Sequence, residues 1–362
     1  MRTSAATASG LPVDWDVAAQ VAARLVRPGR AGGRQEMTDL VADLRRAAAQ
    51  ATGHVVEVTG MTPADGRPSV DVSQVVVVDR TGWARANTEM LESLTRGVTL
   101  PAGGRPASAA ARSAGALQVG GVLSLLAGRV LGQFDPFTRS GPEDGRPGRL
   151  LLVAPNVARM ERELHLDGRD FRLWVALHEQ THALQFAAAP WLEEHLRSRL
   201  RLLLTGLADA DGPLTGDGAI AVATGLARAV RGRDGGSGPE VLLPPDERRL
   251  FDEVGAVMAL LEGHADVAMD AVGRTVVPSL RQIRARFERR RSTDRGAADR
   301  VLRRVLGMDL KLAQYRDGAA FVRRVRRRVG QDGLNAVWSR PDHLPTAAEI
   351  ADPTAWVRRV HG

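Results

Sequence analysis

The sequence predicts a mainly α-helical protein with a small β-sheet, which is an α+β fold. Most of the chain falls into runs of helical length in which apolar side chains recur every three or four positions. Two short stretches favour strands, the β-branched run from Val70 to Val78 and the apolar run from Leu150 to Ala154. A chain of 362 residues is long enough for one large domain or two smaller ones.

Helices are predicted throughout the first part of the chain, after a polar N-terminal stretch, residues 1–12, that we expect to be a flexible tail. Asp14 is placed to cap the first helix, and Pro28 stops it. Residues 54–58 either extend the second helix or form a strand. The fourth helix is apolar all round, so we expect it to be buried. The predicted helices span residues 17–26, 36–51, 83–94 and 109–131.

Helices also dominate the second part of the chain. The strand at 150–154 ends at Pro155, and Asn156 can cap the short helix that follows. Asp170 is placed as the N-cap of the next helix, which Pro190 ends. Further helices are predicted at 191–208, at 246–272, from Pro278 onward and at 300–330, and the segments 336–345 and 356–360 are expected to pack onto the body.

His178, Glu179 and His182 form an H-E-x-x-H motif in an apolar run from Phe171 to Phe186. One helical turn separates the two histidines, so they lie on one face about 6 Å apart along the axis, and both imidazoles can reach one zinc ion. Glu179 lies about 100° round the helix, where it can take a proton from a zinc-activated water without being a ligand. Buried histidine and glutamate are costly unless paired or bound to metal, which favours a zinc site over a chance match.

A catalytic zinc site needs a third protein ligand and an open fourth position. A second apolar helical run, residues 257–270, offers Glu262, and Asp266 lies one turn further along the same face. We expect Glu262 to be the ligand and Asp266 to accept the free ring N–H of a ligand histidine. His264 is the alternative ligand, although it points roughly 200° away from Glu262. Without a metal, this segment would be a buried helix whose two acids face solvent.

These motifs resemble the gluzincin branch of zinc metallopeptidases, in which a distant Glu-x-x-x-Asp helix follows H-E-x-x-H. The separation between the two helices is longer here than in the best-known gluzincins. The chain is more closely similar to an actinobacterial zincin-like family of candidate hydrolases that carries a label linking it to deazaflavin-coenzyme biosynthesis. Short segments across nearly the whole chain share this similarity: residues 13–16, 132–137, 154–157, 170–186, 190–191, 261–266, 314–315, 337–338 and 344–346.

The resemblance implies a zincin-like metallopeptidase fold with a small sheet beside the active-site helix and the strand at 150–154 as its edge strand. It implies Zn²⁺ as the cofactor, with His178, His182 and Glu262 as ligands and Glu179 as general base. Tyr315 is the only tyrosine, and in gluzincins a tyrosine or histidine commonly hydrogen-bonds the developing oxyanion. A core tyrosine with a satisfied hydroxyl is the other interpretation.

We therefore expect a zinc-dependent metallohydrolase of the peptidase type that acts on a peptide or another small acyl substrate. The alternative is a catalytically silent or non-peptidase scaffold that zinc stabilises. The expected organisation is a tail at 1–12, a mostly helical region at 13–148, and a zincin-like catalytic region at 149–362 whose C-terminal part is helical.

The composition argues against several other classes of protein, namely disulfide-bonded, membrane-spanning and nucleic-acid-binding proteins. Cysteine is absent, which excludes disulfides and thiolate metal sites and is consistent with a cytoplasmic protein. No apolar run reaches the ~20 residues that a membrane span requires. Residues 281–330 hold seventeen basic and five acidic residues. Such a stripe could bind nucleic acid, but aromatic residues beside it are sparse, so we expect a solvated helix face and no nucleic-acid partner.

Overall fold

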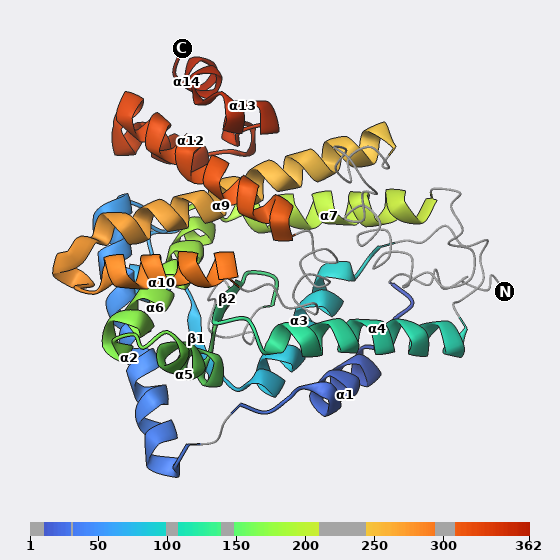
Figure 1. Cartoon of the computed structure of the whole chain (residues 1–362). Helices are drawn as coiled ribbons and strands as arrows, with labels where there is room; N and C mark the ends of the chain where they lie inside the picture. Colours follow the sequence, from blue (N-terminus) through green and yellow to red (C-terminus); the bar gives the residue numbers. More distant parts are fainter. Residues whose placement is uncertain (1–10, 30–31, 99–107, 139–147, 210–243, 294–307) are drawn as a thin grey trace.

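The structure, a computed structural model, describes residues 11–29, 32–98, 108–138, 148–209, 244–293 and 308–362, and it confirms a mainly helical fold with a small sheet (Figure 1). The predicted tail lies almost wholly outside these residues. The helices are α1 (Trp15–Leu25), α2 (Arg34–Thr59), α3 (Arg80–Thr95), α4 (Ala109–Ala127), α5 (Ala154–Glu163), α6 (Gly168–Ala188), α7 (Trp191–Asp209), α9 (Pro245–Val276), α10 (Leu280–Thr293), α12 (Met308–Asn335), α13 (Ala347–Ala351) and α14 (Pro353–His361).

The sheet has three strands in the order β1-β3-β2. Strand β1 (Gln74–Val78) runs parallel to β3 (Arg149–Val153), and β2 (Gly132–Asp135) pairs with β3 in the antiparallel sense. The expectation that the strand near residue 150 is an edge strand is therefore wrong, because β3 lies between the other two. Its continuous apolar run is typical of a strand covered on both faces. The edge strand β2 was not predicted, since its four residues are too few to show an alternating pattern.

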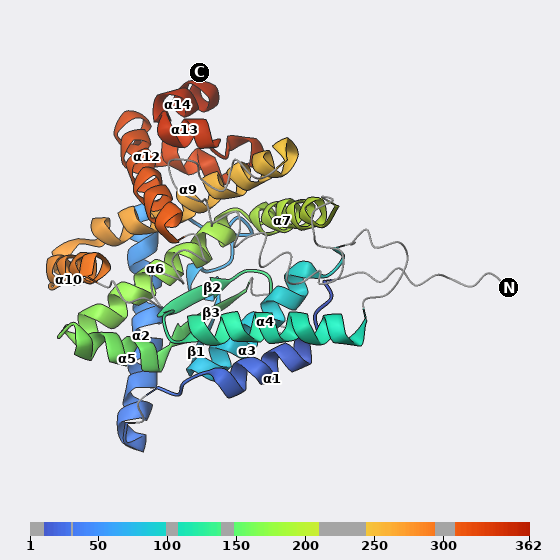
Figure 2. The same ribbon diagram turned by 45° about the vertical axis from the view of Figure 1, so that its right-hand side comes forward.

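The sheet separates two groups of helices (Figure 2). Leu150 and Leu152 belong to the largest core cluster, which includes side chains of α2, α6, α9 and α12. Leu151 and Val153 belong to a second cluster with side chains of α1, α3 and α4. Successive strand residues point to opposite faces, so one short strand holds both clusters together.

Residues 54–58 extend the second helix and do not form a strand, because α2 continues through them. The helix is capped by Gly60, which adopts a left-handed conformation with a φ of 62°. The prediction that the helix at 109–131 is buried all round is wrong. Leu117 and Leu125 of α4 are 59% and 58% exposed, because α1 and α3 cover only its other faces. Among the described helices, α4 also has the length and composition to cross a membrane, a test that core helices of soluble proteins pass as well.

Two predicted caps have other roles. Asp167, and not Asp170, caps α6 by accepting the N–H of Asp170 at 2.9 Å. The Asp170 carboxylate instead accepts the N–H of Ser279 at 2.7 Å, which ties the start of α6 to the loop before α10. Asn156 lies inside α5, and its amide donates to the carbonyl oxygens of Ala127 and Val130. In both cases the local sequence predicts a helix cap, but hydrogen bonds to distant residues determine the role of the side chain.

The C-terminal segments pack onto the body as expected. The Trp356 ring is fully buried against Phe321 of α12, and its indole N–H donates to the carbonyl oxygen of His343 at 2.8 Å. The basic stripe is partly paired, since Arg284 and Arg323 both contact Asp266 and Asp270. These ion pairs join α9 to α10 and α12.

Helices α9 and α12 cross at a contact between two glycines. A Cβ atom added to Gly263 would lie 2.2 Å from the carbonyl carbon of Gly318, and one added to Gly318 would lie 1.9 Å from the carbonyl oxygen of Ala259. Backbone atoms cannot give way as a flexible side chain can, so only glycine allows this distance. The crossing sets the position of α9 at the residue that follows Glu262.

We predict that Gly263→Ala lowers the free energy of unfolding by about 1–3 kcal/mol, because the extra methyl group forces the two helices apart. The matched control is Gly53→Ala in α2, where the added Cβ meets nothing within 4 Å. That control should raise stability by about 0.5–1 kcal/mol. Urea unfolding of both variants checks the prediction, and equal effects would contradict the close crossing.

Candidate metal centre

The two histidines of the motif lie on one face of α6, as their spacing predicts. The Nε2 atoms of His178 and His182 are 3.2 Å apart, and their rings meet edge to face. Leu177, Ala183 and Leu184 around them are fully buried, so the rest of the helix packs into the core. The two imidazoles thus lie beside a largely apolar core.

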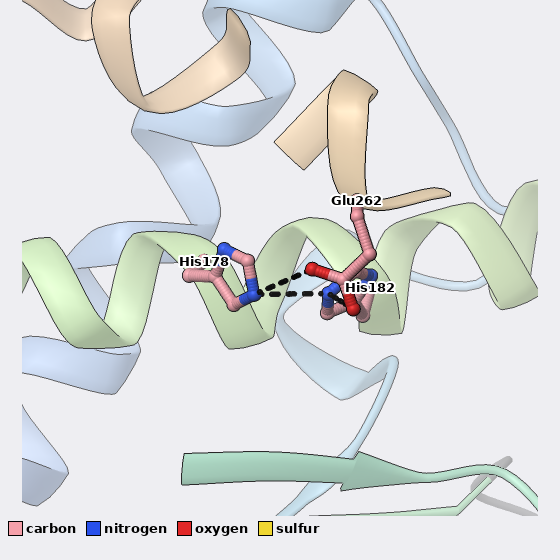
Figure 3. Close-up of side chains that lie close together, drawn as sticks. All are labelled: His178, His182 and Glu262. Carbon is pink, nitrogen blue, oxygen red and sulfur yellow. Dashed lines mark hydrogen bonds and ion pairs between the residues drawn. The ribbon is translucent and has the colours of Figure 1, made fainter. Parts of the chain in front are cut away.

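Helix α9 brings Glu262 to the same point (Figure 3). One carboxylate oxygen lies 3.4 Å from Nε2 of His178 and the other lies 3.8 Å from Nε2 of His182. The side chains are 29%, 12% and 21% exposed for His178, His182 and Glu262, so solvent reaches the cluster from one side. Of the described residues, these three form the only His/Cys/Asp/Glu group that could hold a metal ion.

The donor set fits zinc in both chemistry and spacing. Two imidazole nitrogens and one carboxylate are the ligands of many catalytic zinc sites. Tetrahedral ligands at ~2.1 Å from an ion lie about 3.4 Å from one another, which is close to the distances of 3.2, 3.4 and 3.8 Å between these atoms. The cluster is therefore arranged for a metal with only small adjustments.

His264, the alternative ligand, does not join this cluster. It is buried, and its Nδ1 atom faces the side-chain amide of Gln185 at 3.1 Å while its ring packs edge-on against Trp338. Burial, with the nearby charges of His182 and Arg326, lowers the pKa of His264 to about 3. His264 is therefore a neutral residue of the core.

The expected role of Asp266 is also not what the structure shows. Asp266 pairs with Arg284 and Arg323. Gln185 instead faces the ring of His182, with 2.9 Å between Oε1 and Nδ1. The signal was present in the sequence, because Gln185 lies three residues after His182 in an apolar helix, where an amide must find partners.

Glu179 lies beside the cluster and under strand β2. The Glu179 residue is only 6% exposed. Burial, reinforced by the negative charge of Glu262, raises the pKa of Glu179 to about 7 against the opposing charge of His178. Strand β2 comes this close because residue 132 is glycine: a Cβ atom there would lie 2.7 Å from Cγ of Glu179.

Among the described strands, β2 lies at the edge of the sheet and contacts α6 through Gly132 and Phe134. The carbonyl oxygen of Leu131 accepts the N–H of Val153 in β3 at 2.8 Å. Backbone groups of a strand alternate in direction, so the N–H and C=O groups of Gly132 and Phe134 point away from β3. The edge strand expected beside the active-site helix is thus β2.

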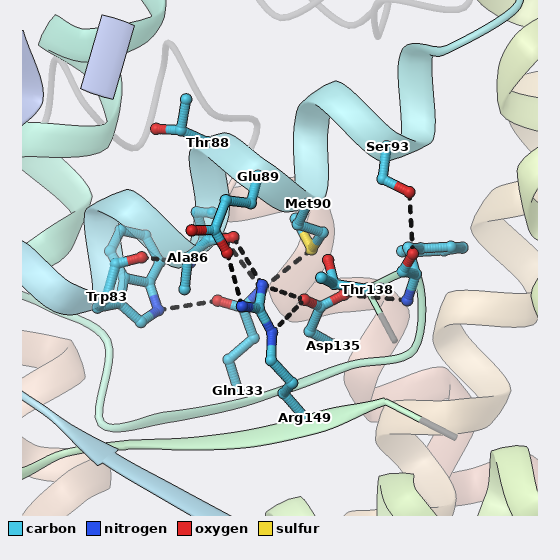
Figure 4. A network of polar contacts seen from close by, with 12 residues as sticks. Trp83, Ala86, Thr88, Glu89, Met90, Ser93, Gln133, Asp135, Thr138 and Arg149 are labelled. Atoms are coloured by element: carbon cyan, nitrogen blue, oxygen red, sulfur yellow. Dashed lines mark hydrogen bonds and ion pairs between the residues drawn. The ribbon is translucent and has the colours of Figure 1, made fainter. Parts of the chain in front are cut away.

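A polar network on the far side of the sheet holds β2 in place (Figure 4). The Arg149 guanidinium contacts the Asp135 carboxylate at 3.0 Å and the Glu89 carboxylate of α3 at 2.7 Å. The Trp83 indole N–H donates to the Gln133 side chain at 2.8 Å. Burial raises the pKa of Asp135, although Arg149 acts in the opposite direction. The network joins β2 and β3 to α3.

Tyr315, the residue considered for the oxyanion, lies within α12, but its side chain is outside the part of the chain that the structure describes. Its role stays a prediction. Sequence reasoning missed Gln185, which contacts His182 in its own helix and Leu261 in α9, and Gly132, whose contact with Glu179 joins distant segments.

We predict that Arg149→Met destabilises the fold by about 3–5 kcal/mol, because it leaves the Asp135 carboxylate buried without its cation. The double variant Asp135→Asn, Arg149→Met should be less destabilised than the single one, since no buried charge remains unpaired. Denaturant unfolding of wild type and variants gives the comparison. Equal losses for the single and double variants would contradict the pairing.

Zinc uptake should be coupled to proton release. Burial alone would lower the pKa of His178, but its hydrogen bond to Glu262 and the charges of Glu179 and Glu262 raise it to about 9. A proton therefore occupies His178 at neutral pH in the metal-free protein, and zinc must displace it. Zinc affinity should rise about tenfold per pH unit between pH 7 and 9. Titration calorimetry in buffers of different ionisation enthalpy measures the released proton, and an affinity independent of pH would contradict the prediction.

Comparisons with known proteins place the chain in a family. A crystal structure of a protein from Chloroflexus aurantiacus, described as a candidate hydrolase with a novel fold, matches with a TM-score of 0.64 and 30% sequence identity over 96% of this chain and 99% of that chain. No curated protein matches the sequence. The zincin-like metallopeptidase family matches residues 13–357, which include both helices of the cluster. The chain therefore belongs to the zincin-like metallopeptidase family.

Proposed function

We propose that the protein is a zinc-dependent hydrolase of the peptidase type, in which His178, His182 and Glu262 hold the metal and Glu179 is the general base. The observation that carries the proposal is the spacing of the three donor atoms, 3.2 to 3.8 Å, with solvent on one side. Three protein ligands leave a fourth position free, as in catalytic zinc sites. Bound there, zinc would lower the pKa of a water molecule to about 7 and polarise the substrate carbonyl group.

Glu179 would accept and transfer the proton of the attacking water. The Glu179 carboxylate is adjacent to the cluster without belonging to it, so it can accept a proton from the attacking water and pass it to the leaving amine. Position, more than acidity, supports the assignment of Glu179 as base.

Strand β2 supports a peptide as the substrate. Among the described strands, β2 lies at the edge of the sheet with Gly132 beside Glu179, and the backbone groups of Gly132 and Phe134 do not point toward β3. An extended peptide can add to such an edge through main-chain hydrogen bonds, which select for a peptide backbone and leave side-chain preference open.

The competing function is a zinc-stabilised scaffold without turnover. A scaffold needs the three ligands but has no use for a buried carboxylate beside them, because burying Glu179 costs stability. The presence of Glu179 therefore favours the hydrolase. The link of the resembling actinobacterial family to deazaflavin-coenzyme biosynthesis and the cytoplasmic location both stay predictions.

We predict that Glu179→Gln keeps stoichiometric zinc but loses hydrolysis by on the order of 10²–10⁴-fold, because the amide cannot accept the proton. His178→Ala should lose both zinc and hydrolysis. His54→Ala in α2 is the control and should keep both. Metal analysis of the purified proteins and mass spectrometry of a digested peptide library give the two readouts.

Two outcomes would contradict the proposal in different ways. If the wild-type protein holds no stoichiometric zinc after metal loading, the proposed metal site does not exist. Full zinc with no cleavage of the library would favour the scaffold.

A further inference from the structure

We propose that the side-chain amide of Gln185 fixes the tautomer of His182 and couples it to the helix that carries Glu262. The inference rests on the proposed zinc site, since it assigns a positioning residue to that site. Gln185 is fully buried in α6, and its amide has three polar neighbours. Oε1 lies 2.9 Å from Nδ1 of His182, while Nε2 lies 3.0 Å from the carbonyl oxygen of Leu261 and 3.1 Å from Nδ1 of His264.

The carbonyl of Leu261 determines which way the amide points. A backbone carbonyl oxygen can only accept a hydrogen bond, so the NH₂ group of Gln185 must face it. Exchanging the two ends of the amide would oppose two carbonyl oxygens and leave a buried donor misplaced, at a cost of about 1–3 kcal/mol. The amide oxygen therefore faces His182.

The orientation of the amide in turn determines where His182 carries its proton. The oxygen of Gln185 can only accept, so Nδ1 of His182 is protonated and donates to it. Nε2 is then the unprotonated nitrogen, and it is the atom that faces His178 and Glu262. The ring is held in the tautomer that a metal requires, before any metal arrives.

The same amide links the two helices of the site. Leu261 immediately precedes Glu262 in α9, so the bond from Gln185 to its carbonyl joins α6 and α9 next to a ligand on each helix. The second N–H of the amide donates to Nδ1 of His264, whose ring is fixed against Trp338. If α9 rotated about its axis, these hydrogen bonds would break and Glu262 would move away from His182 at the same time.

Gln185→Met tests the inference, because methionine keeps the length and the burial of the side chain and removes the hydrogen bonds. Gln180→Met is the matched control. Gln180 lies in the same helix, is also buried, and donates to the carbonyl oxygen of Ala48 away from the site. Both variants lose a buried amide, so a loss of stability alone should affect them alike.

The first readout is the tautomer of His182 in the metal-free protein, from long-range ¹⁵N–¹H correlation spectra of histidine-labelled samples. Wild type and Gln180→Met should show the proton on Nδ1, and Gln185→Met should show it shifted toward Nε2. The second readout is zinc affinity by competition with a chromophoric chelator. Gln185→Met should bind zinc 10–100-fold more weakly than Gln180→Met.

Several results would overturn the inference. A proton on Nε2 of His182 in the wild-type protein would overturn the inference. This measurement needs no variant, so it tests the inference even if Gln185→Met does not fold. Equal zinc affinity of the two variants would also overturn it and leave the proposed function standing. If wild type binds no zinc, the proposed function fails, while the tautomer of the metal-free protein still decides the role of Gln185.

Discussion

The structure depends on the meeting of α6 and α9, two helices that bury polar groups among apolar ones. Alone, each helix would carry imidazole or carboxylate groups into the core without partners, which is costly. Together, they pair His178 with Glu262 and the Gln185 amide with the carbonyl oxygen of Leu261. Buried groups that depend on each other in this way favour one relative position of the two helices, and this position is the one a metal needs.

Other contacts reinforce that position from outside the cluster. The glycine crossing of Gly263 and Gly318 brings α12 against α9 at the residue after Glu262. The ion pairs of Asp266 and Asp270 with Arg284 and Arg323 join α9 to both α10 and α12. Part of the basic stripe thus has a structural use, because its arginines neutralise acids on the outer face of α9.

Strand β2 of the small sheet lies against one side of the site. Exposed strand edges are a liability because their backbone groups are unpaired. Here β2 has only four residues, so the edge it offers is short. On the other side, Arg149, Asp135 and Gln133 fasten the strands to α3. Gly132 of this edge strand lies against Glu179, which is where the proposed peptide substrate would add to the sheet.

The sequence by itself determined the helical class and the residues that could share a metal, because helical periodicity tells which side chains lie on one face of one helix. That was enough to place His178 and His182 on one face with Glu179 beside them, and Glu262 was preferred over His264 because it shares a face with Asp266. Only the tertiary structure decided that Asp266 pairs with arginines and not with a ligand histidine, that β2 forms the edge, and that α4 leaves one face exposed. These outcomes depend on how far apart two elements lie and how each is rotated against the other, and the spacing of residues along one element carries no information about either quantity.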